Sequence, residues 1–169
     1  LNIRLRVAEA RIADMEKRRT LEEELKQLAA SDPLTGLFNR REFDRQVERL
    51  RAESDDLWLC YADLDRFKEI NDNHGHDAGD RFLQQVAACL RDSLPLPHAL
   101  FRFGGDEIVI LTGGTSRQTM QETLGSIRDK IRQFSEKLTG LDPSPSISFG
   151  LALLKKGDDP WQVLAQADT

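Results

Sequence analysis

The spacing of apolar residues changes several times along the chain, and each change indicates a new helix or strand. Apolar positions recur every three or four residues between Phe82 and Leu90, which predicts an amphipathic helix. The nearly continuous apolar run from Leu57 to Ala62 is typical of a buried central strand. The same patterns predict helices over 38–51, 66–73, 77–93, 116–138 and 160–167, and strands over 57–63, 99–103, 107–112 and 146–153. This order predicts an α+β fold in which a mixed, antiparallel-containing sheet is flanked by helices.

The first 30 residues have a different pattern, with many charged residues and no glycine or proline. Apolar residues alternate spacings of four and three, as in a coiled-coil seam, at Leu1, Leu5, Ala8, Ile12 and Met15. The same spacing continues in another frame at Leu21, Leu25 and Leu28, so the heptad phase slips between the two runs. We therefore predict a dimeric coiled-coil helix over 1–30 and a globular domain over 31–169. The alternative is a single amphipathic helix that lies on its own domain.

Composition narrows the classes of function. The net charge is −5, whereas a domain that grips long nucleic acid is usually basic, so nucleic-acid binding is not expected. The two cysteines, Cys60 and Cys89, are too few for a disulfide framework, which indicates free thiols in a reducing cytoplasm. No apolar run approaches the ~18 residues of a membrane-spanning helix, and there is no signal peptide, so we expect no membrane contact. Because Leu1 is not a methionine, we expect an upstream sensor domain in the same polypeptide.

Acidic residues gather at two places where predicted strands end. Asp63 ends the strand over 57–63, while Asp106 and Glu107 follow Gly104 and Gly105 at the tip of a predicted hairpin. Glycine supplies the backbone conformations that a short hairpin needs, and it leaves room for a phosphate. Carboxylates from two neighbouring strands can hold Mg²⁺, and Mg²⁺ holds nucleotide phosphates. The alternative is that these acids are solvated and cap turns.

Four stretches of the sequence together resemble one known family. The hairpin Arg102-Phe103-Gly104-Gly105-Asp106-Glu107-Ile108 resembles the signature of the GGDEF family, the diguanylate cyclases, with Ile108 where the family has phenylalanine. Residues 32–41 (DPLTGLFNRR), 63–72 (DLDRFKEIND) and 75–80 (GHDAGD) resemble further family elements in the same order and spacing. The resemblance implies the palm-like sheet shared by nucleotidyl cyclases and many polymerases.

The resemblance also assigns catalytic and metal-binding roles to the two acidic strand ends. It implies that Mg²⁺, with Mn²⁺ as a substitute, is bound by Asp63, Asp106 and the backbone carbonyl of Leu64. Glu107 is a further candidate, as a ligand or as the base near the attacking hydroxyl. The role of Asp65 is left open between metal binding and structure, because its side chain can equally cap the short helix that follows.

A nucleotide site beside the metal is implied as well. The resemblance assigns guanine binding to Asn71 and Asp80. A carboxylate accepts hydrogen bonds from the ring N1–H and the exocyclic amine of guanine, whereas adenine would leave that carboxylate unpaired. The alternatives are a helix C-cap for Asn71 and a first-turn acid for Asp80. The turn at Arg66, Phe67 and Lys68 opens a helix whose free N–H groups can bind phosphate. Lys68 equally fits an ordinary surface lysine.

The reaction that the resemblance implies is the condensation of two GTP molecules into cyclic di-GMP, with release of two pyrophosphates. Each subunit of a two-fold homodimer would bind one GTP, and the coiled coil would set the distance between the two half-sites and regulate the reaction. Two other interpretations remain, namely a degenerate module that senses GTP or cyclic di-GMP, and an inert domain attached to a dimerisation segment.

Two departures from the family pattern affect this expectation. Many members carry an inhibitory product site, Arg-x-x-Asp, where this chain has Pro95-Leu96-Pro97-His98. Since Pro95 and His98 replace the arginine and the aspartate, we expect no product inhibition there. The chain also stops at Thr169, before the helix and strand that in the family carry a lysine and an arginine facing the phosphates.

Overall fold

A computed structural model describes residues 11–12, 15–18 and 30–168, and it divides the chain into two units, 1–31 and 32–169. Most of the predicted coiled coil lies outside the described residues. Within it, residues 11–12 and 15–18 are helical, and the seam residues Ile12 and Met15 are exposed. None of the described helices is long and apolar enough to cross a membrane.

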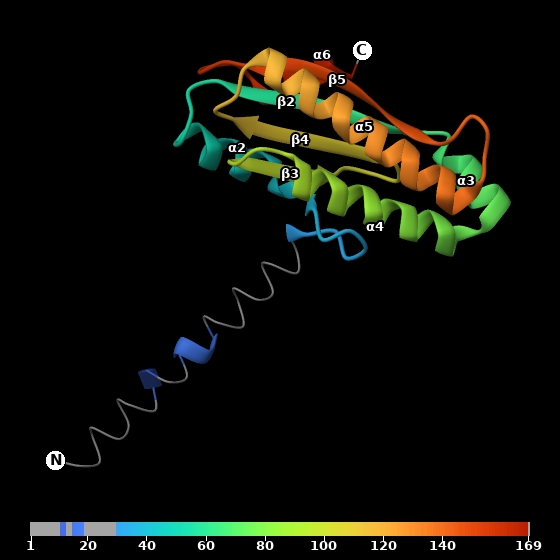
Figure 1. The fold of residues 1–169 in the computed structure, drawn as a ribbon. Helices are drawn as coiled ribbons and strands as arrows, with labels where there is room; N and C mark the ends of the chain where they lie inside the picture. Colours follow the sequence, from blue (N-terminus) through green and yellow to red (C-terminus); the bar gives the residue numbers. More distant parts are fainter. Residues whose placement is uncertain (1–10, 13–14, 19–29, 169) are drawn as a thin grey trace. The chain divides into compact units, whose positions relative to one another are not determined.

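The described part of the second unit contains a mixed five-stranded sheet in the order β1-β3-β4-β2-β5 (Figure 1). β1 pairs in parallel with β3, and the other neighbours are antiparallel. The long strands β2 and β4 lie in the middle, as the continuous apolar run in β2 predicted. The strands are β1 (Phe38–Asn39), β2 (Leu57–Asp65), β3 (His98–Arg102), β4 (Glu107–Gly113) and β5 (Ser146–Leu154).

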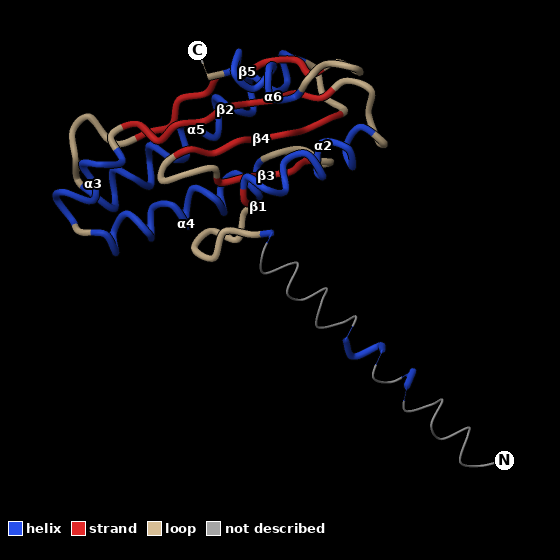
Figure 2. The backbone as a smooth tube through the Cα atoms, turned by 180° about the vertical axis from the view of Figure 1, so that it is seen from behind, coloured by secondary structure: helices blue, strands red, loops and turns tan. Residues whose placement is uncertain are grey.

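Helices cover both faces of the sheet, which confirms the predicted α+β architecture (Figures 1 and 2). Their bounds are η1 (Arg40–Glu42, a 3-10 turn), α2 (Phe43–Arg51), α3 (Phe67–His74), α4 (His76–Ser93), α5 (Arg117–Thr139) and α6 (Pro160–Ala167). Alternate residues of each strand face opposite ways. On β2, Cys60 and Ala62 join the core under α4 and α5, whereas Leu57 and Leu59 join the core under α2 and α6.

The ends of the helices follow from local chemistry. The Ser116 hydroxyl accepts a hydrogen bond of 3.1 Å from the Thr119 amide at the start of α5. That helix ends at Gly140, which adopts a left-handed conformation with φ of 63°. At the start of α6, the Asp159 carboxylate caps the Trp161 amide at 2.9 Å, and Pro160 occupies the first turn.

The structure corrects two predicted boundaries. Residues 38–39 were expected to begin a helix, but they form a strand because Phe38 pairs with Phe101 of β3, and the two rings lie 5.8 Å apart. Tertiary pairing here overrides the helical pattern, and α2 begins only at Phe43. The strand expected to end at Asp63 continues to Asp65, because β5 pairs with β2 as far as Ser146.

Gly150 of β5 allows the C-terminal end of α6 to approach the sheet closely. A Cβ at this position would overlap the backbone carbonyl of Ala167, which cannot move without shifting the helix. We expect Gly150→Ala to lower the free energy of unfolding by about 1–3 kcal/mol, as in other overpacked sites. The matched control is Gly125→Ala on α5, where a Cβ meets open space and should raise helix stability by up to about 1 kcal/mol. Urea unfolding of both variants tests this, and equal stability of the two would contradict it.

Candidate functional site

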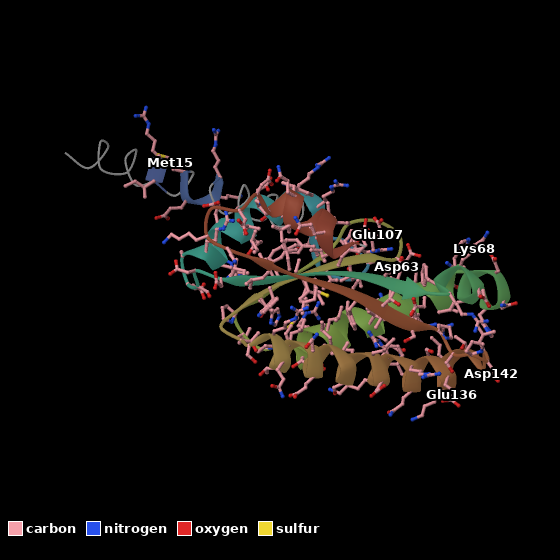
Figure 3. All side chains as sticks on the ribbon, turned by 90° about the horizontal axis from the view of Figure 1, so that it is seen from above. Met15, Asp63, Lys68, Glu107, Glu136 and Asp142 are labelled. Atoms are coloured by element: carbon pink, nitrogen blue, oxygen red, sulfur yellow. The ribbon has the colours of Figure 1, made fainter. Side chains whose placement is uncertain are left out.

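The two acidic segments meet at one end of the sheet. In the antiparallel β2–β4 ladder, Asp63 lies directly opposite Glu107, so their side chains leave the same face of the sheet side by side (Figure 3). Asp106 occupies the turn just before Glu107, and this hairpin is closed by a 3.0 Å hydrogen bond from the Phe103 amide to the Glu107 carbonyl. The expected proximity of the two strands is therefore confirmed, although Asp63 lies two residues before the end of β2.

Negative charge accumulates at this end of the sheet. Partial burial raises the pKa of Asp63 above its ordinary value, and repulsion from Asp106, then from Asp65, Glu107 and Asp168, raises it further. Among the described residues, no lysine or arginine forms an ion pair with Asp63 or Asp106. A divalent cation would remove this repulsion, so the donor set fits one.

The described side chains supply only part of a metal coordination shell. No group of three or more His, Cys, Asp or Glu side chains in the described ranges is arranged to hold an ion. A cation at Asp63 and Asp106 would need backbone carbonyl, phosphate or water oxygens to complete its shell. This arrangement is typical of Mg²⁺, which usually takes one or two carboxylates and retains phosphate and water ligands.

A network around Arg102 holds the hairpin turn in place. The Arg102 guanidinium donates to both carboxylate oxygens of Asp32, at 3.1 and 3.2 Å, and to the carbonyl of Gly105, at 2.9 and 3.2 Å. Thr35 donates to the same Asp32 carboxylate from its amide and its hydroxyl. Burial acts to raise the pKa of Asp32, but these hydrogen bonds and the Arg102 charge outweigh it and lower the pKa. The sequence pattern assigned no role to this network, because Arg102 and Asp32, which join its two halves, lie 70 positions apart.

Tyr61 is a second residue of this site to which the sequence pattern assigned no role. Its hydroxyl donates a hydrogen bond of 2.6 Å to Oε1 of Glu107. Burial, followed by this bond and the nearby carboxylates, raises the pKa of Tyr61, so the phenol stays protonated and acts as a donor. A signal existed in the alternation of strand side chains, since Tyr61 precedes Asp63 by two residues and shares its face.

The structure brings the predicted guanine residues onto adjacent helices. Asn71 lies within α3, and its side-chain amide packs against the backbone of α4 at Gly79, directly before Asp80. Both alternative roles are wrong, because Gly75 is the C-cap of α3 and the first-turn acid of α4 is Asp77. Asp80 is exposed. The side chain of Asn71 therefore contacts the residue that directly precedes Asp80 in α4.

The residues predicted to bind phosphate lie at the start of α3, next to the end of β2. Arg66 adopts a left-handed conformation with φ of 62°, and its guanidinium is held by Glu69, at 2.8 and 2.6 Å, and by the Pro143 carbonyl. The Phe67 ring stacks on Phe82 in the core, with centroids 6.3 Å apart. Lys68 is exposed on α3 (Figure 3) and forms no ion pair within the described part of the chain. The side chain of Lys68 is thus free for a ligand, whereas Arg66 and Phe67 offer backbone groups.

The remaining sequence expectations concern Asp65, the segment 95–98 and the two cysteines. Asp65 does not cap α3 and instead accepts a 2.7 Å hydrogen bond from Ser148 on β5. Pro95, Leu96 and Pro97 lie in the connection between α4 and β3, and His98 begins β3; Leu96 is 81% exposed, and the His98 ring lies 3.2 Å from the Pro95 carbonyl. Both cysteines are free thiols, as predicted, and burial raises the pKa of Cys60 to about 12.

Comparisons with known proteins agree on one family. A family model described as "Diguanylate cyclase, GGDEF domain" matches residues 29–169. Diguanylate cyclase DgcP of Pseudomonas aeruginosa is 35% identical over 150 residues, which cover 86% of this chain and 22% of DgcP. Cyclic di-GMP phosphodiesterase PdeR of Escherichia coli is 31% identical over 159 residues, covering 92% of this chain and 24% of PdeR. The chain therefore spans about a quarter of the length of these curated relatives.

A solved structure gives the same answer at the level of the fold. The coiled coil and GGDEF domain of DgcB from Caulobacter crescentus, in complex with c-di-GMP, superposes with a TM-score of 0.83 and 27% identity. The match covers 99% of this chain and 91% of that structure. The sheet order and the flanking helices are thus those of a known domain architecture.

The raised pKa of Asp63, caused by partial burial and then by the neighbouring acids, predicts how stability changes with pH. A carboxyl whose pKa is raised by folding binds its proton more tightly in the folded state, so its contribution to stability is lost as the pH rises through its titration. We expect Asp63→Asn to raise the melting temperature at neutral pH in EDTA, and this gain should disappear in acid. The control is Asp56→Asn, which changes an exposed acid at the opposite end of β2. A lower melting temperature for Asp63→Asn at neutral pH would contradict the assignment.

Proposed function

This chain belongs to the GGDEF domain family of diguanylate cyclases, and we propose that it condenses two GTP molecules into cyclic di-GMP and two pyrophosphates. The observation that carries the proposal is the convergence of Asp63, Asp106 and Glu107 at one end of the sheet. These carboxylates come from separate strands and repel one another. A site that binds a metal–nucleotide complex explains why they are kept together.

Asp63 and Asp106 would hold the divalent ion, together with the carbonyl of Leu64 and, in part, Glu107. Beyond Asp63, β2 pairs only with β5, so the backbone edge on the β4 side has no strand partner at Leu64. When bound, Mg²⁺ or Mn²⁺ neutralises phosphate charge and lowers the pKa of a coordinated hydroxyl. Asp106 and Glu107 then orient the reacting groups, with Glu107 as the group nearest the attacking hydroxyl.

The nucleotide would lie between the hairpin and the two helices that follow β2. Asp80 would accept hydrogen bonds from the guanine N1–H and exocyclic amine, and the Asn71 amide would donate to the base. The phosphates would meet the backbone amides of Arg66 and Phe67 at the start of α3, with Lys68 as a mobile cation beside them. Gly104 and Gly105 keep the turn free of side chains where the phosphates approach.

The reaction needs two copies of the site. The 3′-hydroxyl of one GTP attacks the α-phosphate of the other, which forms one phosphodiester bond and releases pyrophosphate, and a second symmetric attack closes the ring. Each subunit of a homodimer would supply one half-site, and the N-terminal coiled coil would align the two under control of an upstream sensor. We also propose that no product inhibition acts through Pro95 and His98, and that the domain works in the cytoplasm, where free thiols persist.

The direct test is to incubate the full-length protein with GTP and Mg²⁺ and to detect cyclic di-GMP by mass spectrometry. Wild-type protein should form the product, and Asp106→Ala should form none while its circular dichroism spectrum stays unchanged. Asp56→Ala, an exposed acid at the other end of β2, should keep full activity. Wild-type protein that binds GTP without forming product would contradict the proposal and favour a non-catalytic binding module.

The contact between α3 and α4 offers a test of the guanine pocket. A Cβ on Gly79 would overlap the Asn71 amide oxygen, so Gly79→Ala must displace this side chain. We expect the KM for GTP to rise about tenfold, the equivalent of one lost hydrogen bond. The control is Gly125→Ala on α5, where the added Cβ meets open space, and this variant should leave the KM unchanged. An unaltered KM in Gly79→Ala would show that Asn71 does not contact the base.

A further inference from the structure

The carboxylate of Glu107 is fixed by a hydrogen bond from a neighbouring strand. Tyr61 lies opposite Val109 in the β2–β4 ladder, and Asp63 lies opposite Glu107, so Tyr61 and Glu107 are diagonal neighbours on one face. The Tyr61 hydroxyl reaches across this diagonal and donates to Oε1 of Glu107 at 2.6 Å. A short hydrogen bond to a charged acceptor is among the stronger kinds in proteins. One oxygen of the carboxylate therefore has a fixed partner.

The second oxygen of Glu107 is directed toward the signature turn. A Cβ on Gly104 would lie 2.9 Å from Oε2 of Glu107, so this oxygen lies close to the turn that contains the two glycines. Oε1 is thus bound by Tyr61, while Oε2 lies near Gly104 of the hairpin turn. The hydrogen bond from β2 therefore holds one oxygen of the carboxylate, and the other oxygen faces the turn that contains Gly104.

Packing also limits the movement of Tyr61. Its ring packs against the buried residues that α2 and α6 cover, and it lines a cavity of about 250 Å³ together with Phe103, Trp161 and Glu107. The rings of Phe103 and Trp161, which line this cavity, lie 5.9 Å apart. A tyrosine ring with two χ angles that is held on one side by an apolar cluster loses little entropy when its hydroxyl binds a partner. Tyr61 is therefore suited to hold another side chain in place.

We propose that Tyr61 is a positioning residue that holds Glu107 by Oε1 and so presents Oε2 as a single-oxygen ligand for the catalytic metal ion. This inference rests on the proposed function, because it assigns the hydrogen bond to the reaction of that same site. Residues that orient a metal ligand through a hydrogen bond typically contribute 10–100-fold to metal affinity or activity. Tyr61 does not contact the substrate, and its effect passes through Glu107.

The test replaces the hydroxyl and keeps the ring. In Tyr61→Phe, we expect kcat to fall about tenfold, and the affinity for Mn²⁺ to fall by about the same factor. Mn²⁺ binding is followed by electron paramagnetic resonance on the full-length protein in the presence of 3′-deoxy-GTP, which lacks the attacking hydroxyl. The control is Ser148→Ala, which removes another hydroxyl that donates to a carboxylate on β2, at Asp65. This variant should keep both the kcat and the Mn²⁺ affinity of the wild type.

The outcomes separate this inference from the proposed function. Product from the wild type, with reduced kcat and Mn²⁺ affinity only in Tyr61→Phe, supports both. Product at equal rates from the wild type and Tyr61→Phe overturns the inference alone. A lower kcat in Tyr61→Phe with unchanged Mn²⁺ affinity also overturns the inference alone. The same holds if Ser148→Ala loses as much kcat and Mn²⁺ affinity as Tyr61→Phe. Either result would mean that the hydrogen bond between Tyr61 and Glu107 has only a structural role. A wild type that forms no product overturns the proposed function and the inference with it.

Discussion

The carboxylates at the ends of β2 and β4 repel one another, and the rest of the domain holds them together against that repulsion. The ladder register places Asp63 opposite Glu107; partial burial raises the pKa of Asp63, and repulsion from Asp106 and the other acidic neighbours raises it further. Like charges at such positions destabilise a sheet. A fold selected for stability alone would have no reason to keep them there, and a site for a metal-bound nucleotide gives one.

Two features of the framework oppose this repulsion. The first is the sheet itself, in which β2 and β4 are central strands with fully buried apolar residues on both faces. The second is the Arg102 network, which ties the hairpin turn to Asp32 and to the carbonyl of Gly105. Arg102 neutralises Asp32 but forms no ion pair with Asp63 or Asp106 among the described residues. The positive charge therefore stabilises the turn and leaves the acidic end of the sheet available for a cation.

Most of the fold could be predicted from the sequence, because in the long helices and strands the periodicity of apolar residues matches the faces that are buried by tertiary packing. The helices over 77–93 and 116–138 and the central strands were predicted close to their observed bounds. Phe38 and Asn39 were predicted wrongly because their strand conformation depends on pairing with β3, which local pattern does not reveal. The extension of β2 to Asp65 has the same cause, since it depends on the length of β5.

At the candidate site, the acidic residues could be predicted from the sequence, but the residues that position them could not. The bond between Arg102 and Asp32 joins residues 70 positions apart, and the bond between Tyr61 and Glu107 requires the strand register. The strand register is also what brings the two acidic strand ends together into one site.

The proposed function requires a divalent ion at this site. Anomalous scattering from a crystal of the protein with Mn²⁺ and 3′-deoxy-GTP locates the ion directly. We predict a peak within coordination distance of the Asp63 and Asp106 carboxylates. A peak elsewhere, with no manganese at these two residues, would contradict the account.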